Sequence, residues 1–233
     1  MSLLNDDHKM FVEQVRRMVV EKVAPRAAEI DAKAEFPWDI KEVFQEMGLL
    51  GLAVPEEYGG CSQGHLFTCL AVEEIAKACV SSSLIVQVQA LGWDPIFLGG
   101  SEEQKKKWGP RVASGEAITA FGLTEAGAGS DAAAMGSRAV KKGDSYVING
   151  SKHFISNGPV ADVITVMAMT DADQGVRGIS AFIVEKDFPG FKVAKQESKM
   201  GIKGSPTAEL VFEDMEVPAE NLIGEEGKGF VYA

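Results

Sequence analysis

The sequence predicts an α+β fold, in which an N-terminal all-helical domain is followed by a small antiparallel β-barrel or sandwich domain. Apolar residues recur at helical spacing up to about residue 115, and short β-prone segments separated by turn residues follow them. Strands that are short and regularly spaced are typical of a small sandwich or barrel. The chain has 233 residues, 45% of them hydrophobic, which is enough for a substantial core in one or two domains.

The first helix is expected to begin after Asn5, whose side chain can cap a helix N-terminus. Pro25 should kink or interrupt it, because proline has no N–H to donate inside a helix. A second helix near Trp38–Met47 should end at Gly48, since glycine readily adopts the left-handed conformation that ends helices. Further helices are expected near Leu66–Lys77 and Ser83–Leu91, and the capping-box sequence from Ser101 to Gln104 should open another that reaches about Ala113.

After Gly115 the residue types change to those of short strands separated by turns. The expected strands are Ala117–Leu123, Ser137–Lys141, Tyr146–Asn149, Val163–Met169, Ile179–Val184, Val193–Glu197 and Ala208–Phe212. Hairpin turns are expected at Lys142–Asp144 and at Asp187–Gly190. Beyond Pro218, the segment Asn221–Phe230 has the residue pattern of the beginning of another helix.

Charge and composition exclude several classes of function. The formal net charge of −11 argues against a nucleic-acid-binding protein, because the phosphates would be repelled. Three cysteines without metal-like spacing favour a reduced compartment, and the three histidines share no spacing suited to a metal, so no metal site is predicted. The chain shows neither a signal peptide nor an apolar run near the ~20 residues of a membrane-spanning helix. We therefore expect no membrane span and a cytoplasmic location.

The most informative motif runs from Ala120 to Asp131, where an apolar strand stops at Thr124 and a loop rich in glycine, serine and acidic residues begins. Within it, Gly127–Ala132 fits the dinucleotide-binding pattern G-x-G-x-x-A. No long helix follows, because turn and strand signals resume by Gly136, and no βαβ unit surrounds the pattern, so a Rossmann site is not favoured. On composition alone, a glycine-rich turn without a ligand is the alternative.

A second motif, Asn149–Gly158, lies about 25 residues further along. Together the two motifs resemble the flavin-binding segments of the acyl-CoA dehydrogenase family. The first family pattern is matched by Phe121, Leu123, Thr124, Glu125, Gly127, Gly129, Ser130 and Asp131, and the second by Asn149, Gly150, Lys152, Phe154, Ile155, Ser156 and Asn157. Shorter matches at Pro55–Gly60, Glu103–Lys107 and Gly201–Thr207 extend the resemblance over the whole chain.

The resemblance implies an FAD site that consists of Phe121, Leu123, Thr124, Gly129, Ser130, Phe154, Ile155 and Ser156. Thr124 would stabilise the negative charge that develops near flavin N1 and O2 on reduction. Phe154, which stands where the family often has Trp, would pack by the ring system, and Ser156 would face N5 and O4. Ser130 would contact a diphosphate oxygen of the flavin or of CoA. Without the motif, Phe121 and Phe154 could be core aromatics, and Thr124 and Ser130 could be turn caps.

The resemblance also implies an acyl-CoA substrate bound by Ser130, Ser83, Gln87, Leu91 and Val176. Ser83, Gln87 and Leu91 are spaced i, i+4, i+8 and share one face of the predicted helix, which lines the acyl pocket in the family. Gln87 near the acyl tail would suggest a functionalised or short acyl chain, and a buried helix with a satisfied glutamine is the alternative. Val176 falls where some members of the family touch CoA.

The implied reaction is α,β-dehydrogenation of an acyl-CoA thioester, in which a carboxylate removes a proton from Cα while hydride leaves Cβ for flavin N5. In the family that carboxylate comes from the C-terminal helical domain or from the helix that would begin around residues 225–233. We expect neither position to lie within this sequence, so no catalytic residue is predicted and the fragment should be inactive. The expected domains are residues 1–116 (helical), 117–218 (β-barrel) and 219–233 (start of the missing helical domain). Electron-transfer flavoprotein is an implied partner, and the full-length protein is expected to be a homo-oligomer.

Two other interpretations stay open at this point. The chain could belong to a family relative that has changed its chemistry, such as a decarboxylating dehydrogenase, an oxidase or a desulfinase. It could also be a non-catalytic module that binds CoA or flavin. The colour of the purified protein separates the last interpretation from the others, because a bound flavin absorbs visible light.

Overall fold

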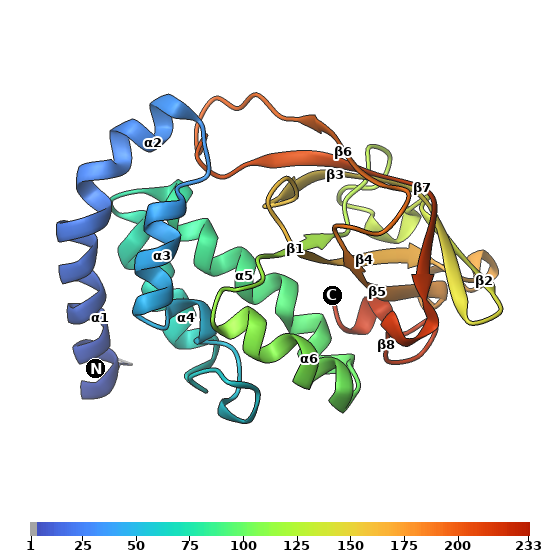
Figure 1. Cartoon of the computed structure of the whole chain (residues 1–233), viewed down its shortest axis with the longest axis horizontal. Coiled ribbons are helices and arrows are strands. Elements are labelled where there is room, and N and C mark those ends of the chain that lie inside the picture. Colours follow the sequence, from blue (N-terminus) through green and yellow to red (C-terminus); the bar gives the residue numbers. More distant parts are fainter. Residues whose placement is uncertain (1–3) are drawn as a thin grey trace. The chain divides into compact units, whose positions relative to one another are not determined.

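The computed structural model describes residues 4–233, so the first three residues of the predicted helical domain lie outside the described part. Its helices and strands are labelled in Figure 1. The chain divides into two compact units. Unit 1 contains the described residues up to Ala90 together with Gly109–Glu116 and Ser198–Pro206, and unit 2 contains Leu91–Trp108, Ala117–Glu197 and Thr207–Ala233.

Unit 1 begins with the capped helix that the sequence predicts. In α1 (Asp6–Met18), Asn5 Oδ1 accepts a hydrogen bond of 2.9 Å from the N–H of His8. A π-helical turn (Val19–Val23) and a 3₁₀ turn (Ala24–Arg26) then lead into α2 (Ala27–Lys33). Pro25 lies in the 3₁₀ turn, which confirms the predicted interruption, because a residue without an N–H cannot continue the helical hydrogen-bond ladder.

The next two helices of unit 1 also follow the prediction. Helix α3 (Trp38–Glu46) ends before Gly48, whose φ of 69° is left-handed as expected. Two 3₁₀ turns, Leu49–Gly51 and Glu56–Tyr58, lead to α4 (Gly64–Ala76). Helices α1, α3 and α4 each supply buried apolar side chains, among them Val15, Ile40, Phe44 and Ile75.

Helix α5 (Val80–Gly99) is longer than the predicted Ser83–Leu91, and it continues through Pro95. Trp93 and Ile96 in its second half are fully buried, and this burial outweighs the cost of a proline inside the helix. Helix α6 (Glu102–Ala113) opens with the predicted capping box, in which Ser101 Oγ accepts from the N–H of Gln104 at 3.2 Å and Gln104 Oε1 accepts from the N–H of Ser101 at 2.9 Å.

Unit 2 is built on one mostly antiparallel sheet of eight strands. The strands are β1 (Thr119–Gly122), β2 (Arg138–Lys142), β3 (Ser145–Ser156), β4 (Val163–Met169), β5 (Ile179–Glu185), β6 (Phe191–Gln196), β7 (Thr207–Pro218) and β8 (Leu222–Ile223). All seven predicted strands occur, and β3 and β7 are much longer than expected. Burial explains the length of β7, since Met215 and Val217 beyond its predicted end are fully buried.

The strand order is β6-β7-β3-β2-β4-β5-β8, and β1 pairs with β4 in parallel. Strands β2 and β4 share one pairing, Arg138 with Met169, so the sheet consists of two parts joined at that position. Ile148 and Leu210 from one part and Ile164 and Phe182 from the other belong to a single buried cluster. This arrangement confirms the predicted α+β class with a sandwich-like β domain, although the sheet is open rather than closed.

Two local predictions in unit 2 are wrong. Asp187–Gly190 is a turn but not a hairpin, because β5 pairs with β4 and β8 while β6 pairs with β7. The expected helix over Asn221–Phe230 is replaced by strand β8 and a 3₁₀ turn at Gly229–Val231. Gly224 and Gly227, with φ of 66° and 76°, take left-handed conformations that a helix does not accommodate. The hairpin at Lys142–Asp144 is confirmed by the β2–β3 pairing of Lys142 with Ser145.

Candidate functional site

The first motif follows strand β1 and closes on itself. Strand β1 ends at Gly122, and Phe121, Leu123 and Thr124 are half-buried. The backbone N–H of Glu125 donates to the carbonyl of Ala128 at 3.1 Å, and the N–H of Ala128 donates back to the carbonyl of Glu125 at 3.1 Å. Only a short 3₁₀ turn (Ala132–Ala134) follows, which agrees with the argument against a Rossmann site.

The second motif lies in the irregular end of β3. Its pairing with β7 shifts register between Lys152 and Ile155, and the intervening Phe154 has a φ of 59°. An aromatic residue with positive φ is uncommon, and the cost is accepted where function or packing demands it. Packing does not explain Phe154, because 63% of its surface is exposed. The interpretation of Phe154 as a core aromatic is therefore wrong.

The two motifs lie side by side in unit 2. The N–H of His153 donates to the carbonyl of Thr124 at 2.8 Å, which joins their backbones directly. The ammonium of Lys152 donates to the carbonyl of Leu123 at 3.1 Å, and the Asn157 side-chain amide donates to the carbonyl of Thr119 at 3.3 Å. Segments that are separate in the sequence thus present Thr124, Phe154 and Ser156 from adjacent stretches of backbone.

A buried ion pair stands between the motifs. Lys152 is completely buried, and its ammonium lies 2.7 Å from a carboxylate oxygen of Glu125. Burial lowers the pKa of Lys152, while hydrogen bonding and attraction to Glu125 oppose that shift. Burial also acts to raise the pKa of Glu125, but its bonds with Lys152, Ser137 and Gly136 prevail, so the pKa is lowered. Both residues belong to the motifs, but nothing in the sequence predicts that they form an ion pair.

Polar atoms at the two motifs lack partners within the described part of the chain. Over residues 4–233, the hydroxyl groups of Thr124, Ser130 and Ser156 make no hydrogen bond. The buried Oδ1 of Asn157 likewise has no partner among these residues. Thr124 and Ser156 are half-buried, whereas Ser130 is exposed. Hydroxyls that do not cap turns are available to a ligand, and for Thr124 and Ser130 this removes the turn-cap alternative.

Three further predicted cofactor residues differ in character. Ile155 is 2% exposed and belongs to the hydrophobic core, so a ligand could reach its backbone but not its side chain. Gly129 is exposed in the loop, and a side chain added there would meet no neighbouring atom within 4 Å. Phe121 is half-buried in β1, where it pairs with Thr165 of β4.

The predicted substrate residues are distributed over both units. Ser83 is buried in unit 1, and its hydroxyl donates to the carbonyl of Val80 at 2.8 Å. Gln87 is exposed, which overturns the alternative of a satisfied buried glutamine at that position. In unit 2, Leu91 is 44% exposed, and Val176 is 42% exposed in the 3₁₀ turn Ala172–Gly178. Ser130 belongs to the same unit.

Gln89, which the sequence reasoning passed over, is the buried glutamine of α5. It is 2% exposed, and its amide donates to the carbonyl of Val112 at 2.9 Å. The sequence alone does not show which of Gln87 and Gln89 is buried, because both are polar residues within the same apolar helix. Only the packing around the helix shows which of the two faces solvent.

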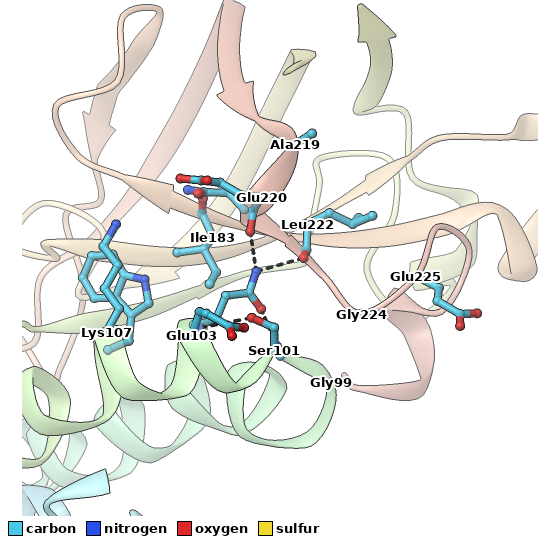
Figure 2. A pocket seen from close by; sticks show the side chains of 14 residues that line it. Gly99, Ser101, Glu103, Lys107, Ile183, Ala219, Glu220, Leu222, Gly224 and Glu225 are labelled. Atoms are coloured by element: carbon cyan, nitrogen blue, oxygen red, sulfur yellow. Dashed lines mark hydrogen bonds between the residues drawn. The ribbon is translucent and has the colours of Figure 1, made fainter. Parts of the chain in front are cut away.

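A cavity of about 590 Å³ lies elsewhere in unit 2, at the beginning of α6. The dashed lines in Figure 2 mark the amide of Gln104 donating to the carbonyls of Glu220 at 2.7 Å and Leu222 at 2.9 Å. Glu103, Glu220 and Glu225 make the lining acidic. None of the predicted cofactor- or substrate-binding residues lines this cavity. The cavity therefore does not support the site predicted from the two motifs.

Comparison with known proteins settles the family. Residues 5–116 match the family model "Acyl-CoA dehydrogenase, N-terminal domain", and residues 120–215 match "Acyl-CoA dehydrogenase, middle domain". The chain belongs to the acyl-CoA dehydrogenase family. The resemblance carried by the two motifs is thus confirmed over both halves of the chain.

Curated members of the acyl-CoA dehydrogenase family are similar over the whole chain. A cyclohex-1-ene-1-carbonyl-CoA dehydrogenase of Syntrophus aciditrophicus is 49% identical over 233 residues, which are 100% of this chain and 56% of that protein. A short-chain-specific acyl-CoA dehydrogenase of Clostridium acetobutylicum is 46% identical over 99% of this chain and 61% of its own length. The chain therefore spans about three-fifths of the length of these relatives.

Solved structures of the family share the fold. A glutaryl-coenzyme A dehydrogenase in complex with glutaryl-CoA has a TM-score of 0.95 and 39% identity over 100% of this chain and 60% of its own. A chain from work on the electron transferring flavoprotein of Acidaminococcus fermentans has a TM-score of 0.95 and 44% identity, over 100% and 62%. An acyl-CoA dehydrogenase of Bacillus anthracis complexed with FAD has a TM-score of 0.89 and 39% identity, over 99% and 39%.

In the part of the chain that the structure describes, no helix is both long and apolar enough to cross a membrane. The same residues contain no group of three or more histidine, cysteine or acidic side chains placed to hold a metal ion. His153 lies beside a single acidic side chain, with its Nε2 3.2 Å from a carboxylate oxygen of Glu209.

Proposed function

We propose that this chain supplies the FAD- and acyl-CoA-binding part of an acyl-CoA dehydrogenase, which removes hydrogen from Cα and Cβ of an acyl thioester. The observation that carries the proposal is the direct backbone contact between the two motifs, at 2.8 Å from His153 N to Thr124 O. It brings unpaired hydroxyls and an exposed aromatic ring to one place in unit 2. The family membership supports the same activity.

The residues at the motifs fit a flavin. A flat ring system with a polar edge needs an apolar face and nearby hydrogen-bonding groups. Phe154 offers the first, with 63% of its surface exposed. Thr124 and Ser156 offer the second, because their hydroxyls make no hydrogen bond within residues 4–233. The similar dehydrogenase of Bacillus anthracis is complexed with FAD, which supports the choice of this cofactor.

Each residue has a proposed task. Bound FAD would accept the hydride that leaves Cβ at its N5. Thr124 would donate a hydrogen bond to the pyrimidine edge and favour the charge that accumulates there, and Ser156 would face N5 and O4. Phe154 would cover the ring system, and Phe121, Leu123, Gly129 and the Ile155 backbone would complete the site.

Each predicted substrate residue has a proposed task of its own. We propose that Ser130 holds a diphosphate oxygen, that Val176 lies against the CoA portion, and that Ser83, Gln87 and Leu91 lie along the acyl chain. The exposure of Gln87 and Leu91 supports their availability to a ligand. The hydroxyl of Ser83 already donates to the carbonyl of Val80, so Ser83 would lie along the acyl chain without donating a hydrogen bond to it.

We propose that none of these residues is the catalytic base. Glu125 lies between the motifs, but its carboxylate is occupied by Lys152 and by the N–H groups of Gly136 and Ser137. A base must approach Cα from the side away from the flavin. We place it in a C-terminal helical domain expected after domains 1–116 and 117–218, to which residues 219–233, with β8 and a 3₁₀ turn, would lead. Electron-transfer flavoprotein as acceptor and a homo-oligomeric full-length enzyme belong to the same proposal.

Absorbance and titration test the proposal. Purified chain should show the two visible bands of oxidised flavin, either as isolated or after FAD is added. Thr124→Val and Ser156→Ala should each weaken FAD binding, whereas Ser145→Ala, a serine at the other end of β3, should leave it unchanged. A colourless protein that binds CoA and ignores FAD would favour the non-catalytic module instead.

A decarboxylating relative is the second candidate, since the glutaryl-CoA dehydrogenase structure is similar at a TM-score of 0.95. Both reactions share the flavin and the acyl thioester, so the two motifs would serve either. Titration of the yellow chain with a plain short-chain acyl-CoA and with a dicarboxylic acyl-CoA separates them, because only a decarboxylating site would prefer the terminal carboxylate.

A further inference from the structure

The buried pair of Lys152 and Glu125 does more than neutralise two charges. Glu125 directly follows Thr124, and its carboxylate accepts hydrogen bonds from the N–H of Gly136 at 2.5 Å and of Ser137 at 3.0 Å. The loop of residues 126–135 lies between these partners, and it carries Gly127, Gly129 and Ser130. A single carboxylate thus closes this loop at its far end.

The near end of the loop is closed by the same residue. The backbone of Glu125 exchanges two hydrogen bonds of 3.1 Å with Ala128, and Ala128 is 1% exposed. Most of the loop consists of small residues and glycines, and the buried Met135 lies at its end, beside Lys152. The rest of the loop therefore has little packing of its own to hold it in one conformation. Its shape depends on Glu125.

Lys152 connects this closure to the second motif. Its ammonium donates to Glu125 at 2.7 Å and to the carbonyl of Leu123 at 3.1 Å, so it contacts the residues on both sides of Thr124. The next residue along β3, His153, donates its N–H to the Thr124 carbonyl at 2.8 Å. Phe154 follows immediately with its left-handed backbone. Thr124 directly precedes Glu125, and Ser130 lies in the loop that follows it. Phe154 lies shortly after Lys152 on β3.

Stability alone does not account for such a pair. Taking both charges out of water costs about as much as their attraction returns, so an apolar pair of similar volume would stabilise the fold equally well. Fully bonded buried polar groups do fix one arrangement of the backbone around them, because every alternative leaves a charge without a partner.

We infer that Lys152 and Glu125 are positioning residues of the proposed flavin site, which hold the Thr124 strand end, the loop of residues 126–135 and the Phe154 bulge in one geometry. The inference rests on the proposed function for its ligand, but the closure of the loop can be measured without it. Neither residue touches the cofactor in this account, and both act through the segments that they fix.

The double variant Lys152→Met with Glu125→Gln tests the inference. Both replacements are close in shape to the originals, and together they leave no unpaired buried charge, so the variant should fold even where Lys152→Met alone does not. Amide exchange over residues 126–137 should accelerate by about tenfold or more, while the amides of β4 keep their protection. The dissociation constant for added FAD should rise by about 10- to 100-fold, the range typical for groups that orient a binding site.

Two controls separate positioning from general damage. Lys107→Met breaks the exposed pair with Glu185, at 2.8 Å in the same unit, and should change neither readout. Tyr146→Phe removes a part-buried hydrogen bond to Glu226 at a residue outside both motifs, and should lower stability without changing FAD affinity. Equal weakening of FAD binding by Tyr146→Phe at matched stability would overturn the inference.

The remaining outcomes are also decisive. Unchanged exchange over residues 126–137 in the double variant would overturn the inference whether or not FAD binds. Faster exchange with unchanged FAD affinity would show that the loop does not position the cofactor. If the unaltered chain binds no FAD, the proposed function fails and the flavin role of the pair fails with it, while the exchange data still report whether the pair closes the loop.

Discussion

Phe154 combines a backbone conformation that costs energy with a side chain that gains little from burial. Its φ of 59° is followed by a φ of 61° at Asn157, whose buried Oδ1 lacks a partner among residues 4–233. Such a cluster of costly features inside one motif is characteristic of binding sites, where the surrounding structure imposes the strain. The sequence placed both residues in one motif, but it did not indicate that both have a left-handed backbone.

Replacement of Phe154 by glycine should therefore leave the protein at least as stable while it weakens FAD binding. Relief of the left-handed conformation is worth about 1 kcal/mol, and the greater freedom of glycine in the unfolded chain offsets part of it. Urea unfolding and FAD titration on the same preparation measure both effects. A loss of about 2 kcal/mol or more would instead identify Phe154 as a core residue.

Tyr146 predicts how stability depends on alkaline pH. Burial, aided by the hydrogen bond and the negative charge of Glu226, raises the pKa of Tyr146 from 10.0 to about 12. Since the folded-state pKa is the higher one, this stabilisation is complete below pH 10 and is lost as the pH rises towards 12. The loss should amount to about 2–3 kcal/mol at most.

The difference between the unaltered chain and Tyr146→Phe isolates this group, because all other titrations are common to both. The unfolding free energy of the unaltered chain should fall more steeply above about pH 10 than that of the variant. Parallel curves for the two proteins would show that Tyr146 titrates normally.

At the scale of elements, helices were predicted best where local signals control them. The Asn5 cap, the Gly48 stop and the Ser101–Gln104 capping box are contacts between residues a few positions apart, and all three occur in the structure. The second half of α5 was missed, because Pro95 is a local signal to stop. The burial of Trp93 and Ile96, which depends on residues distant in the sequence, stabilises the helix beyond this point.

Gln104 should matter more than an ordinary capping residue. Besides its part in the capping box, its amide donates to the carbonyl of Glu220, which precedes β8, and to that of Leu222, the first residue of β8. Gln104→Ala should cost about 2–4 kcal/mol, because it removes the cap contact and leaves two carbonyls without their donor. Ser101→Ala, which removes the cap alone, should cost about 1 kcal/mol.

Chemical denaturation of both variants provides the comparison. Amide exchange around β8 should increase in Gln104→Ala and stay unchanged in Ser101→Ala. Equal destabilisation by the two substitutions would mean that the contacts to residues 220 and 222 contribute nothing beyond the cap.

At the scale of the whole molecule, the predicted strands all occur, but only one of the two expected hairpins does. Asp187–Gly190 has the composition of a hairpin turn, yet it leads from one part of the sheet to the other. Composition reports that the chain turns, whereas the choice of neighbouring strand depends on which apolar faces meet in the shared core.

The isolated chain of 233 residues should bind FAD and acyl-CoA without turnover, because we assign the base to a region outside these residues. Under anaerobic conditions, addition of a saturated short-chain acyl-CoA to the yellow protein should shift its absorbance without bleaching the flavin. Chemical reduction with dithionite serves as the control for a reducible flavin. Bleaching by the acyl-CoA would mean that a base is present within the chain.

The sequence by itself determined the family, the helical and β halves, the caps and turns, and the identity of the two motifs. These properties follow from residue types at short spacing, which act through local backbone geometry. The tertiary structure alone decided that Lys152 pairs with Glu125, that Phe154 is exposed and that Gln89 rather than Gln87 is buried. Each of these depends on which distant segments exclude water from a side chain, and that is a property of packing rather than of any stretch of sequence.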